Sequence, residues 1–343
     1  MFSRLRSAAM EPEAVLNIGT LGAARITPSA LVRPARKVDG VVVAAVAARD
    51  PERAAAFAAK QGIPRVHSTY EDLLADPDLA AVYIPLPNGL HAEWTLKALE
   101  AGKHVLCEKP FTSNAAEARR VAEAAAGSGL VVMEAFHYRY HPLAERMKHI
   151  VDSGVLGGIR HIETTICITL PLKNDIRYRY ELAGGATMDV GSYGIHQLRF
   201  LASAEPEVIA ATARLARPYV DRWMQADFRF ADGRTGRMTC ALLSVRLFDL
   251  SIRVSGTDGD LHVFNPTGPQ FFSRLRIKSK SRVATERVLG EATYVYQLKA
   301  FAAACLEGKT VPTGPADAVA NMAVIDEVYR AAGLPVRGTA VVG

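Results

Sequence analysis

Short apolar runs alternate with amphipathic stretches over the first 133 residues of the chain. The runs that we interpret as strands cover residues 15–19, 41–47, 80–84, 104–107 and 130–133. Several of these runs are apolar at every position, so both faces of the strand are expected to be buried. Strands of this kind, separated by helices, predict a Rossmann-type, doubly wound parallel sheet.

The pattern changes after about Tyr138. Longer strand-like segments follow, at residues 159–168, 207–217, 224–230, 237–243 and 247–255, and turn signals such as Asp232-Gly233 join them. Helices are expected from Thr187 to about Leu201, from 294 to 306 and from 316 to 332. We therefore expect an α/β chain with two domains. Residues 1–137 form a nucleotide-binding domain, and residues 138–343 form an α+β domain with a large, mostly antiparallel open sheet.

Composition and charge remove several classes of function. The net charge of +6 is spread along the chain, and the densest basic cluster, residues 274–287, has no interleaved aromatic residues. This argues against nucleic-acid binding. The longest apolar run, residues 41–48, is far too short for a membrane span, and no secretory signal follows Arg4 and Arg6. The four cysteines lack metal-ligand spacing, so we expect a cytoplasmic protein without a metal.

A small-residue turn, residues 19–26, follows the first predicted strand. In dinucleotide-binding folds such a turn lets the backbone approach a pyrophosphate. We expect the cofactor to contact Gly22, Ala24, Arg25 and Ile26. The match to the G-x-G-x-x-G pattern is imperfect, because Ala24 takes the second glycine position, and an ordinary strand-to-helix turn fits about as well.

Two further segments lie where a Rossmann sheet binds its cofactor. Arg49 follows the second strand and can pair with the 2′-phosphate of NADP; Asp50 either reads the bare ribose of NAD or caps the next helix. NADP is therefore favoured and NAD remains open. The segment Leu86-Pro87-Asn88, with His91, predicts a rigid loop at the carboxyl edge of the sheet, where it contacts the cofactor or caps a helix.

Candidate chemistry is concentrated in two places. Glu108-Lys109-Pro110 ends a buried strand, and a lysine there can hydrogen-bond a substrate oxygen or assist a neighbouring acid/base group; a surface ion pair between Glu108 and Lys109 is the alternative. After the Gly184-Gly185 pair, Asp189, Tyr193 and His196 have the i, i+4, i+7 spacing of one helical face. The glycines leave room for a ligand or for close packing.

Taken together these segments resemble the Gfo/Idh/MocA family of oxidoreductases. The resemblance rests on Glu108-Lys109-Pro110, on the double glycine before Asp189 and Tyr193, and on segments 48–52, 86–91 and 134–142. It runs from about Val15 to Arg337. The family has glycine more often than Ala24. Tyr193, together with segment 171–178, resembles the branch of glucose-fructose oxidoreductase, dihydrodiol dehydrogenases and sugar ketoreductases.

The resemblance implies hydride transfer between NAD(P) and a sugar-like or cyclic diol substrate. Tyr193 would be the general acid/base, helped by the Lys109 cation, and Asp189 would orient Lys109 or the substrate. Arg139, Arg177 and His196 are expected near the substrate. A non-redox relative, such as a glycosidase that uses the cofactor transiently, and a dinucleotide sensor without turnover remain as alternatives.

Strand segments of the second domain have apolar residues at successive positions, as at Val208-Ile209 and Leu242-Leu243. Neighbours on a strand point to opposite faces, which predicts an open, apolar sheet face. Both this pattern and the resemblance imply a homodimer or a dimer of dimers. The alternative is a monomer in which the segment 264–287 covers that face.

Overall fold

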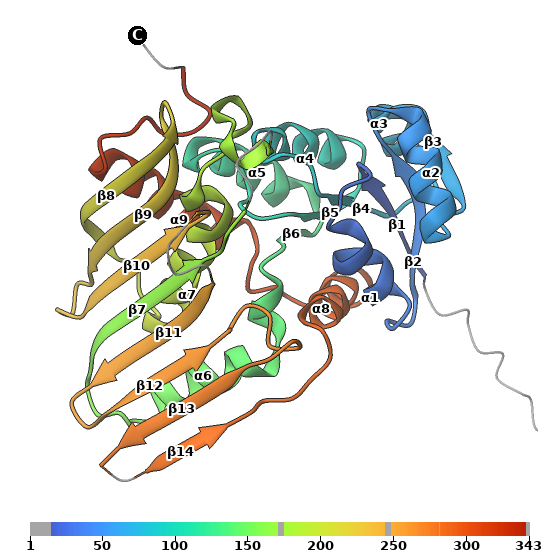
Figure 1. The fold of residues 1–343 in the computed structure, drawn as a ribbon. Helices are drawn as coiled ribbons and strands as arrows, with labels where there is room; N and C mark the ends of the chain where they lie inside the picture. The colour runs from blue at the N-terminus through green and yellow to red at the C-terminus, as the bar shows by residue number, and fades with distance from the viewer. Residues whose placement is uncertain (1–14, 171–174, 244–247, 281, 341–343) are drawn as a thin grey trace, which may run out of the picture.

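Two β-sheets organise the chain. A computed structural model describes residues 15–170, 175–243, 248–280 and 282–340. In Figure 1 a six-stranded sheet with its helices lies beside a broad eight-stranded sheet. The predicted fold class, a Rossmann-type parallel sheet followed by a large and mostly antiparallel one, is confirmed.

The first sheet has the strand order β3-β2-β1-β4-β5-β6, and every pairing in it is parallel. Its strands are β1 (Leu16–Leu21), β2 (Val41–Ala47), β3 (Arg65–His67), β4 (Ala81–Ile84), β5 (His104–Cys107) and β6 (Val132–Glu134). The strand order reverses between β1 and β4. In open parallel sheets this point creates a crevice beyond the carboxyl ends of the strands, and ligands bind there.

The helices that connect these strands are α2 (Pro51–Gln61), α3 (Tyr70–Leu74), α4 (His91–Glu100) and α5 (Ala115–Ser128), and a 3₁₀ turn, η2 (Asn88–Leu90), precedes α4. The expected helix after the first strand differs from prediction. It consists of a π-helical turn, η1 (Pro28–Val32), and the short α1 (Arg33–Ala35). Pro34 lacks a backbone N–H donor, which interrupts regular α-helical hydrogen bonding there.

The second sheet has the order β14-β13-β12-β11-β7-β10-β9-β8, with β7 and β10 as its one parallel pair among the described residues. Its strands are β7 (Ile159–Cys167), β8 (Glu207–Arg217), β9 (Val220–Arg229), β10 (Thr235–Ala241), β11 (Asp249–Gly256), β12 (Gly259–Phe264), β13 (Arg274–Ser279) and β14 (Val283–Glu286). The basic segment 274–287 thus adds strands at the edge of the sheet and does not cover its face.

One face of the second sheet is covered by helices. These are α6 (Pro142–Asp152), α7 (Ser192–Ala202) and α9 (Pro315–Ala331), and α9 also packs on α5 of the first sheet. Short turns η3 (His137–Tyr140), η4 (Ile176–Tyr178) and η5 (Tyr180–Leu182) connect these layers. The chain finally returns to the first sheet, because α8 (Thr293–Glu307) buries Leu298 and Phe301 in the core that contains β1 and β2. The domain boundary at residues 137/138 stays a prediction.

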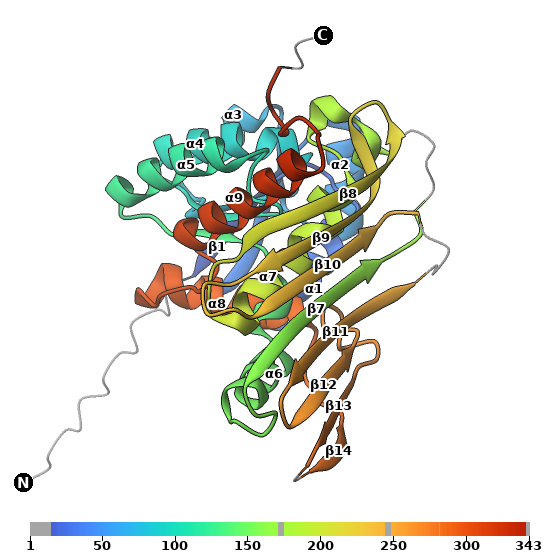
Figure 2. The ribbon, with the colours of Figure 1, turned by 90° about the vertical axis from the view of Figure 1, so that its left-hand side faces the viewer.

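The other face of the second sheet has no helix across it among the described residues (Figure 2). This face is not the apolar surface that the sequence predicted. Strand register places Gln225, Arg237, Glu163 and Arg253 on it, whereas the inward positions next to them are buried and apolar. The physical reason is that the apolar doublets, such as Val208-Ile209, lie at a bulge or at a strand end and not along the centre of the strands.

Candidate functional site

Lys109 lies just beyond the carboxyl end of β5, between the two sheets. Its Nζ donates a hydrogen bond of 2.6 Å to the backbone oxygen of Asp189 and one of 3.1 Å to the Oδ1 of the same residue. The Lys109 side chain is only 14% exposed. The alternative of a surface ion pair with Glu108 is wrong, because Glu108 turns the other way and accepts a hydrogen bond of 2.6 Å from the Tyr83 hydroxyl.

Asp189 is a buried carboxylate between two cations. Its Oδ2 accepts a hydrogen bond of 2.8 Å from Nε of Arg177, opposite the contact with Lys109. Burial by itself would raise the pKa of the Asp189 carboxyl, but Lys109 and Arg177 together outweigh burial and hold this pKa below its usual range. Asp189 is therefore ionised at neutral pH and fixes the Lys109 ammonium group from one side.

Tyr193 completes the group. The Nζ of Lys109 lies 5.0 Å from the centre of the Tyr193 ring, within the range of a cation–π contact. Burial, reinforced by the negative charges of Glu108 and Asp189, raises the pKa of Tyr193 well above its usual range. The phenol therefore keeps its proton at neutral pH and can act as a proton donor.

The helix that holds these residues has two parts. Its first turn, η6 (Thr187–Gly191), is π-helical, and α7 follows directly, where a single α-helix was predicted. π-helical turns are frequent at functional sites. Asp189 and Tyr193 both contact Lys109, whereas His196 packs with Tyr193 against the ring of Phe136.

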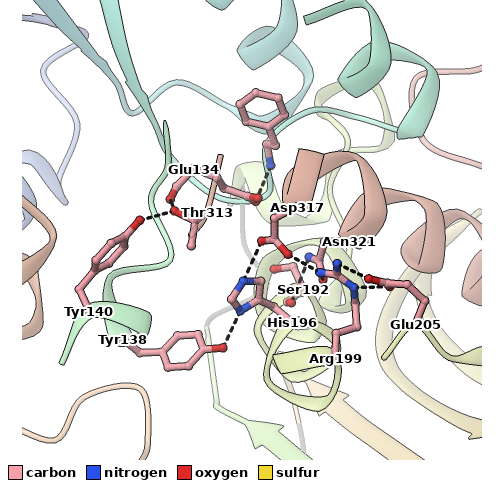
Figure 3. A network of polar contacts seen from close by, with 11 residues as sticks. Glu134, Tyr138, Tyr140, Ser192, His196, Arg199, Glu205, Thr313, Asp317 and Asn321 are labelled. Atoms are coloured by element: carbon pink, nitrogen blue, oxygen red, sulfur yellow. Dashed lines mark hydrogen bonds and ion pairs between the residues drawn. The ribbon is translucent and has the colours of Figure 1, made fainter. Parts of the chain in front are cut away.

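His196 belongs to a buried polar network that links it to Tyr138 and Asp317 (Figure 3). Its Nε2 lies 3.0 Å from the Asp317 carboxylate, and its Nδ1 lies 2.5 Å from the Tyr138 hydroxyl. Asp317 also receives a hydrogen bond of 2.9 Å from Arg199, and its pKa is about 2: burial opposes ionisation, but His196 and Arg199 outweigh it. An ionised carboxylate only accepts, so we assign the His196 proton to Nε2 and the donor role in the other contact to Tyr138. Both ring nitrogens are thus occupied away from Lys109.

Glu134, at the end of β6, lies in the same network and was not found from the sequence. Its Oε1 accepts a hydrogen bond of 2.9 Å from the Phe111 amide, and its buried Oε2 has no partner among the described residues. Burial raises the pKa of Glu134 well above its usual range, so this side chain is protonated at neutral pH. A single acid after an apolar strand gave no signal that distinguishes it from a surface residue.

The turn after β1, which we call the phosphate turn because a pyrophosphate is expected there, packs closely against the loop after β4. Gly22 has a φ of +110°, and a Cβ on it would come within 3.3 Å of Leu86. Arg53, which the sequence analysis missed, donates a hydrogen bond of 2.7 Å to the Ala23 carbonyl and so ties this turn to α2. In the sequence, the signal for this role of Arg53 was its position three residues after Asp50. Ala24 and Ile26 are half-buried beside Gly22.

Arg49 and Asp50 lie between the end of β2 and the start of α2, and they have different roles. The Asp50 carboxylate accepts hydrogen bonds from the backbone N–H groups of Glu52 and Arg53 and so caps α2. Arg49 is exposed at the carboxyl edge of the sheet. Burial raises the pKa of the nearby Tyr70 phenol, and Arg49 partly offsets this rise.

The loop after β4 is held firmly against its neighbours. His91 lies 2.8 Å from the carbonyl oxygen of Leu86 and 2.8 Å from that of Pro110, and so links this loop to the segment after Lys109. Asn88 does not cap α4; its Nδ2 donates to the Ala183 carbonyl at 3.0 Å and joins the loop to the segment before η6. Pro87 precedes the 3₁₀ turn η2. The loop therefore positions the edge of the crevice.

The remaining candidates are spread around the crevice. Arg25 is almost fully exposed and lies 3.8 Å from Asp175. Arg139 stacks on Phe200 at 4.0 Å. Arg177 is committed to Asp189 and Asp175. Residues 171–174 of the segment that entered the resemblance lie outside the described residues. The structure thus brings Lys109, Asp189, Tyr193 and Arg177 together, whereas the hydrogen bonds of His196 go to Tyr138 and Asp317.

Known proteins with this architecture are oxidoreductases. Residues 16–136 match the model of the "oxidoreductase family, NAD-binding Rossmann fold", and residues 144–262 match the "GFO/IDH/MocA C-terminal domain". The chain is 38% identical over 322 residues to D-xylose 1-dehydrogenase (NADP(+)) 2 of Haloferax volcanii, which covers 92% of this chain and 96% of the relative. It is 33% identical over 228 residues to trans-1,2-dihydrobenzene-1,2-diol dehydrogenase of Sus scrofa, which covers 65% of this chain and 66% of the relative.

Solved structures agree in fold over nearly the whole length. KijD10, a 3-ketoreductase from Actinomadura kijaniata in complex with NADP and TDP-benzene, superimposes with a TM-score of 0.86 at 28% identity, over 92% of this chain and 98% of that chain. The aldose-aldose oxidoreductase from Caulobacter crescentus gives a TM-score of 0.85 at 25% identity, over 93% and 98%. Two family models and a near full-length relative agree: the chain belongs to the Gfo/Idh/MocA family of NAD-binding oxidoreductases.

Proposed function

We propose that this protein is an NADP-dependent dehydrogenase or reductase that transfers hydride between the nicotinamide and a hydroxyl or carbonyl carbon of a sugar, a sugar derivative or a cyclic diol. The observation that carries the proposal is the joint placement of Lys109, Asp189 and Tyr193 beyond the carboxyl end of β5. This is the sheet edge at which the phosphate turn and Arg49 also lie.

In the proposed reaction each residue has one role. When bound, the nicotinamide supplies hydride in reduction and accepts it in oxidation. In reduction the Lys109 ammonium binds the carbonyl oxygen and polarises it, and Tyr193 donates its phenolic proton to that oxygen. The proton then returns to Tyr193 from solvent. Asp189 holds Lys109 in place, and its negative charge reduces the repulsion between the Lys109 ammonium group and a cationic cofactor.

The cofactor assignment rests on the end of β2. Oδ1 of Asp50 is engaged in capping α2, which reduces the capacity of this carboxylate to accept the ribose hydroxyls of NAD. The exposed Arg49 is then the group that reads this position, and its planar, always charged guanidinium suits a 2′-phosphate. The xylose dehydrogenase relative is named for NADP(+), and KijD10 was solved with NADP.

The substrate would enter on the side of the crevice formed by Arg139 and Arg177. The names of the relatives favour aldoses, keto-sugar nucleotides and cyclic diols. We further propose a cytoplasmic homodimer or dimer of dimers formed through the uncovered face of the second sheet. The mixed charges of that face, such as Arg237 beside Asp227, would make the interface polar. No helix in the described part of the chain is long and apolar enough to span a membrane.

A substrate screen tests the proposal. Purified protein is mixed with NADP or NADPH and with aldoses, cyclitols, cyclic diols or keto-sugar nucleotides, and the absorbance of the reduced cofactor is followed. The proposal predicts turnover with at least one sugar-like compound. Consumption of a glycoside without net change in reduced cofactor would instead support a glycosidase, and tight cofactor binding without turnover of any compound would support a sensor.

A further inference from the structure

A second ion pair lies far from solvent on the other side of η6. Arg337, in the segment after α9, contacts Asp221 of β9 at 2.9 Å, and both side chains are fully buried. Charges are costly to remove from water unless their hydrogen bonds are satisfied. The partners of this pair therefore indicate what the pair stabilises.

Those partners lie mainly in one short segment, residues 184–187. Nε of Arg337 donates a hydrogen bond of 2.7 Å to the Gly184 carbonyl. Oδ2 of Asp221 accepts hydrogen bonds of 2.7 Å from both the backbone N–H and the hydroxyl of Thr187. Tyr329 supports the pair from α9, with its hydroxyl 3.0 Å from the Asp221 carboxylate and its ring 3.9 Å from the guanidinium.

The same segment sets the position of Asp189. The Asp189 backbone N–H donates to the Gly185 carbonyl at 3.0 Å, and the Gly185 N–H donates to the Arg177 carbonyl at 2.8 Å. Arg177 in turn holds the Asp189 carboxylate. Movement of residues 184–187 would therefore move both Asp189 and its second cation.

The double glycine has its explanation here. Gly185 has a φ of +138°, and a Cβ on it would lie 2.2 Å from Oδ1 of Asp221. A Cβ on Gly184 would lie 2.6 Å from the Arg177 carbonyl oxygen. Of the two alternatives, room for a ligand or close packing, the structure shows close packing: Gly185 lies against the buried pair, and Gly184 lies against the backbone of Arg177.

We infer that Arg337 and Asp221 form a clasp, defined by these two side chains, that positions Asp189 and through it Lys109. The inference rests on the proposed function, because Asp189 matters to turnover only if Lys109 acts on the substrate. Neither clasp residue touches the crevice, so both are positioning residues. Loss of the clasp should lower kcat, since small misplacements of a reacting group are costly, and should leave cofactor binding intact.

The test compares Arg337→Met and Arg337→Lys with Arg330→Met, which removes an exposed arginine from the last turn of α9. At a temperature where the variant is folded, Arg337→Met should bind NADPH within about twofold of wild type and lose about tenfold to a hundredfold in kcat. Looser contacts of Asp189 with its cations should also raise the pKa of Asp189, so the acid limb of the kcat–pH profile should move to higher pH. Arg337→Lys should recover part of kcat, and Arg330→Met should match wild type.

A folded Arg337→Met protein with normal kcat and an unmoved acid limb would overturn the inference, whatever its melting temperature. If Arg337→Met does not fold, Arg337→Lys takes its place, and a normal kcat and acid limb in that variant would overturn it equally. If the wild type turns over none of the compounds, the proposed function has failed. The clasp is then tested separately, by hydrogen exchange of the amides of residues 185–193. Faster exchange in the Arg337 variant than in Arg330→Met supports the clasp, and equal exchange contradicts it.

Discussion

The ammonium group of Lys109, at the edge of the first sheet, donates to both the backbone oxygen and the carboxylate of Asp189, which lies on a helix of the second sheet. This pair joins the two halves of the molecule at the point where a substrate would meet the cofactor. It also explains how Lys109 is held in a fixed direction although it is largely buried. The account of function depends first on this contact.

Replacement of Lys109 by Ala, or of Tyr193 by Phe, should reduce kcat by about a hundredfold or more, because each change removes a group that handles the substrate oxygen. Steady-state kinetics with a confirmed substrate would measure the loss. Lys97→Ala and Tyr219→Phe alter the same residue types at exposed or partly exposed positions and should have no effect. Near-normal turnover in both site variants would disprove the assignment.

Arg49→Ala should weaken NADPH binding by about tenfold or more and leave NADH binding unchanged, because a charge-assisted contact to the 2′-phosphate is lost. Fluorescence titration of wild type and variant with both cofactors would show this. Arg36→Ala removes another exposed arginine of the first half and serves as the control. A wild type that prefers NADH, or an Arg49 variant with unchanged affinities, would rule out the role given to Arg49.

The environment of Asp326 predicts that a substitution at this position will stabilise the folded protein. Burial raises the pKa of this carboxyl to about 6, and its Oδ1 has no partner among the described residues, while Oδ2 accepts from the Ala115 amide. A raised pKa means that folding binds a proton between pH 3.8 and about 6, so stability falls as the pH rises through this window.

Asp326→Asn keeps an acceptor for Ala115 and should raise the free energy of unfolding at pH 7 by about 1–2 kcal/mol after allowance for partial exposure. The gain should vanish at about pH 3 and below, where the wild-type carboxyl is protonated in both states. Urea unfolding at the two pH values measures it, and Glu327→Gln, at an exposed position of α9, is the control. A gain of equal size at both pH values would contradict the electrostatic explanation.

The His196 network predicts a change in stability without a change in substrate binding. Tyr138→Phe removes the 2.5 Å contact and leaves the buried Nδ1 of His196 without a donor, at a cost of about 1–3 kcal/mol. KM should be unaffected, since His196 faces Tyr138 and Asp317 rather than Lys109. Chemical denaturation and kinetics test the two halves of this prediction. A changed KM with unchanged stability would restore His196 to the substrate site.

Local sequence was enough to predict what depends on short-range patterns. Fully apolar strands followed by helices led to the parallel sheet, and the position of Lys109 after such a strand led to the crevice. The spacing of Asp189 and Tyr193 also predicted that they meet, although the turn between them is π-helical. Each of these inferences needed only a strand end or one helical face.

Partners from distant parts of the chain could not be predicted in this way. His196 has the spacing of the Asp189 face, but its ring pairs with Asp317, which is 121 residues away. The same is true of the glycine pair, whose neighbour Arg337 lies 153 residues from Gly184. Strands β12 to β14 were missed because β13 alternates Leu275 and Ile277 with basic residues, which looked like a charge cluster.

The central claim is hydride transfer with Lys109 and Tyr193 at the reacting oxygen. The most direct measurement uses NADPH that carries deuterium at nicotinamide C4, a keto-sugar that the protein reduces, and mass spectrometry of the product. We predict that the wild type places deuterium on the new carbinol carbon and that Lys109→Ala and Tyr193→Phe form little labelled product. A wild-type product without deuterium, or equal labelling by all three proteins, would contradict the account.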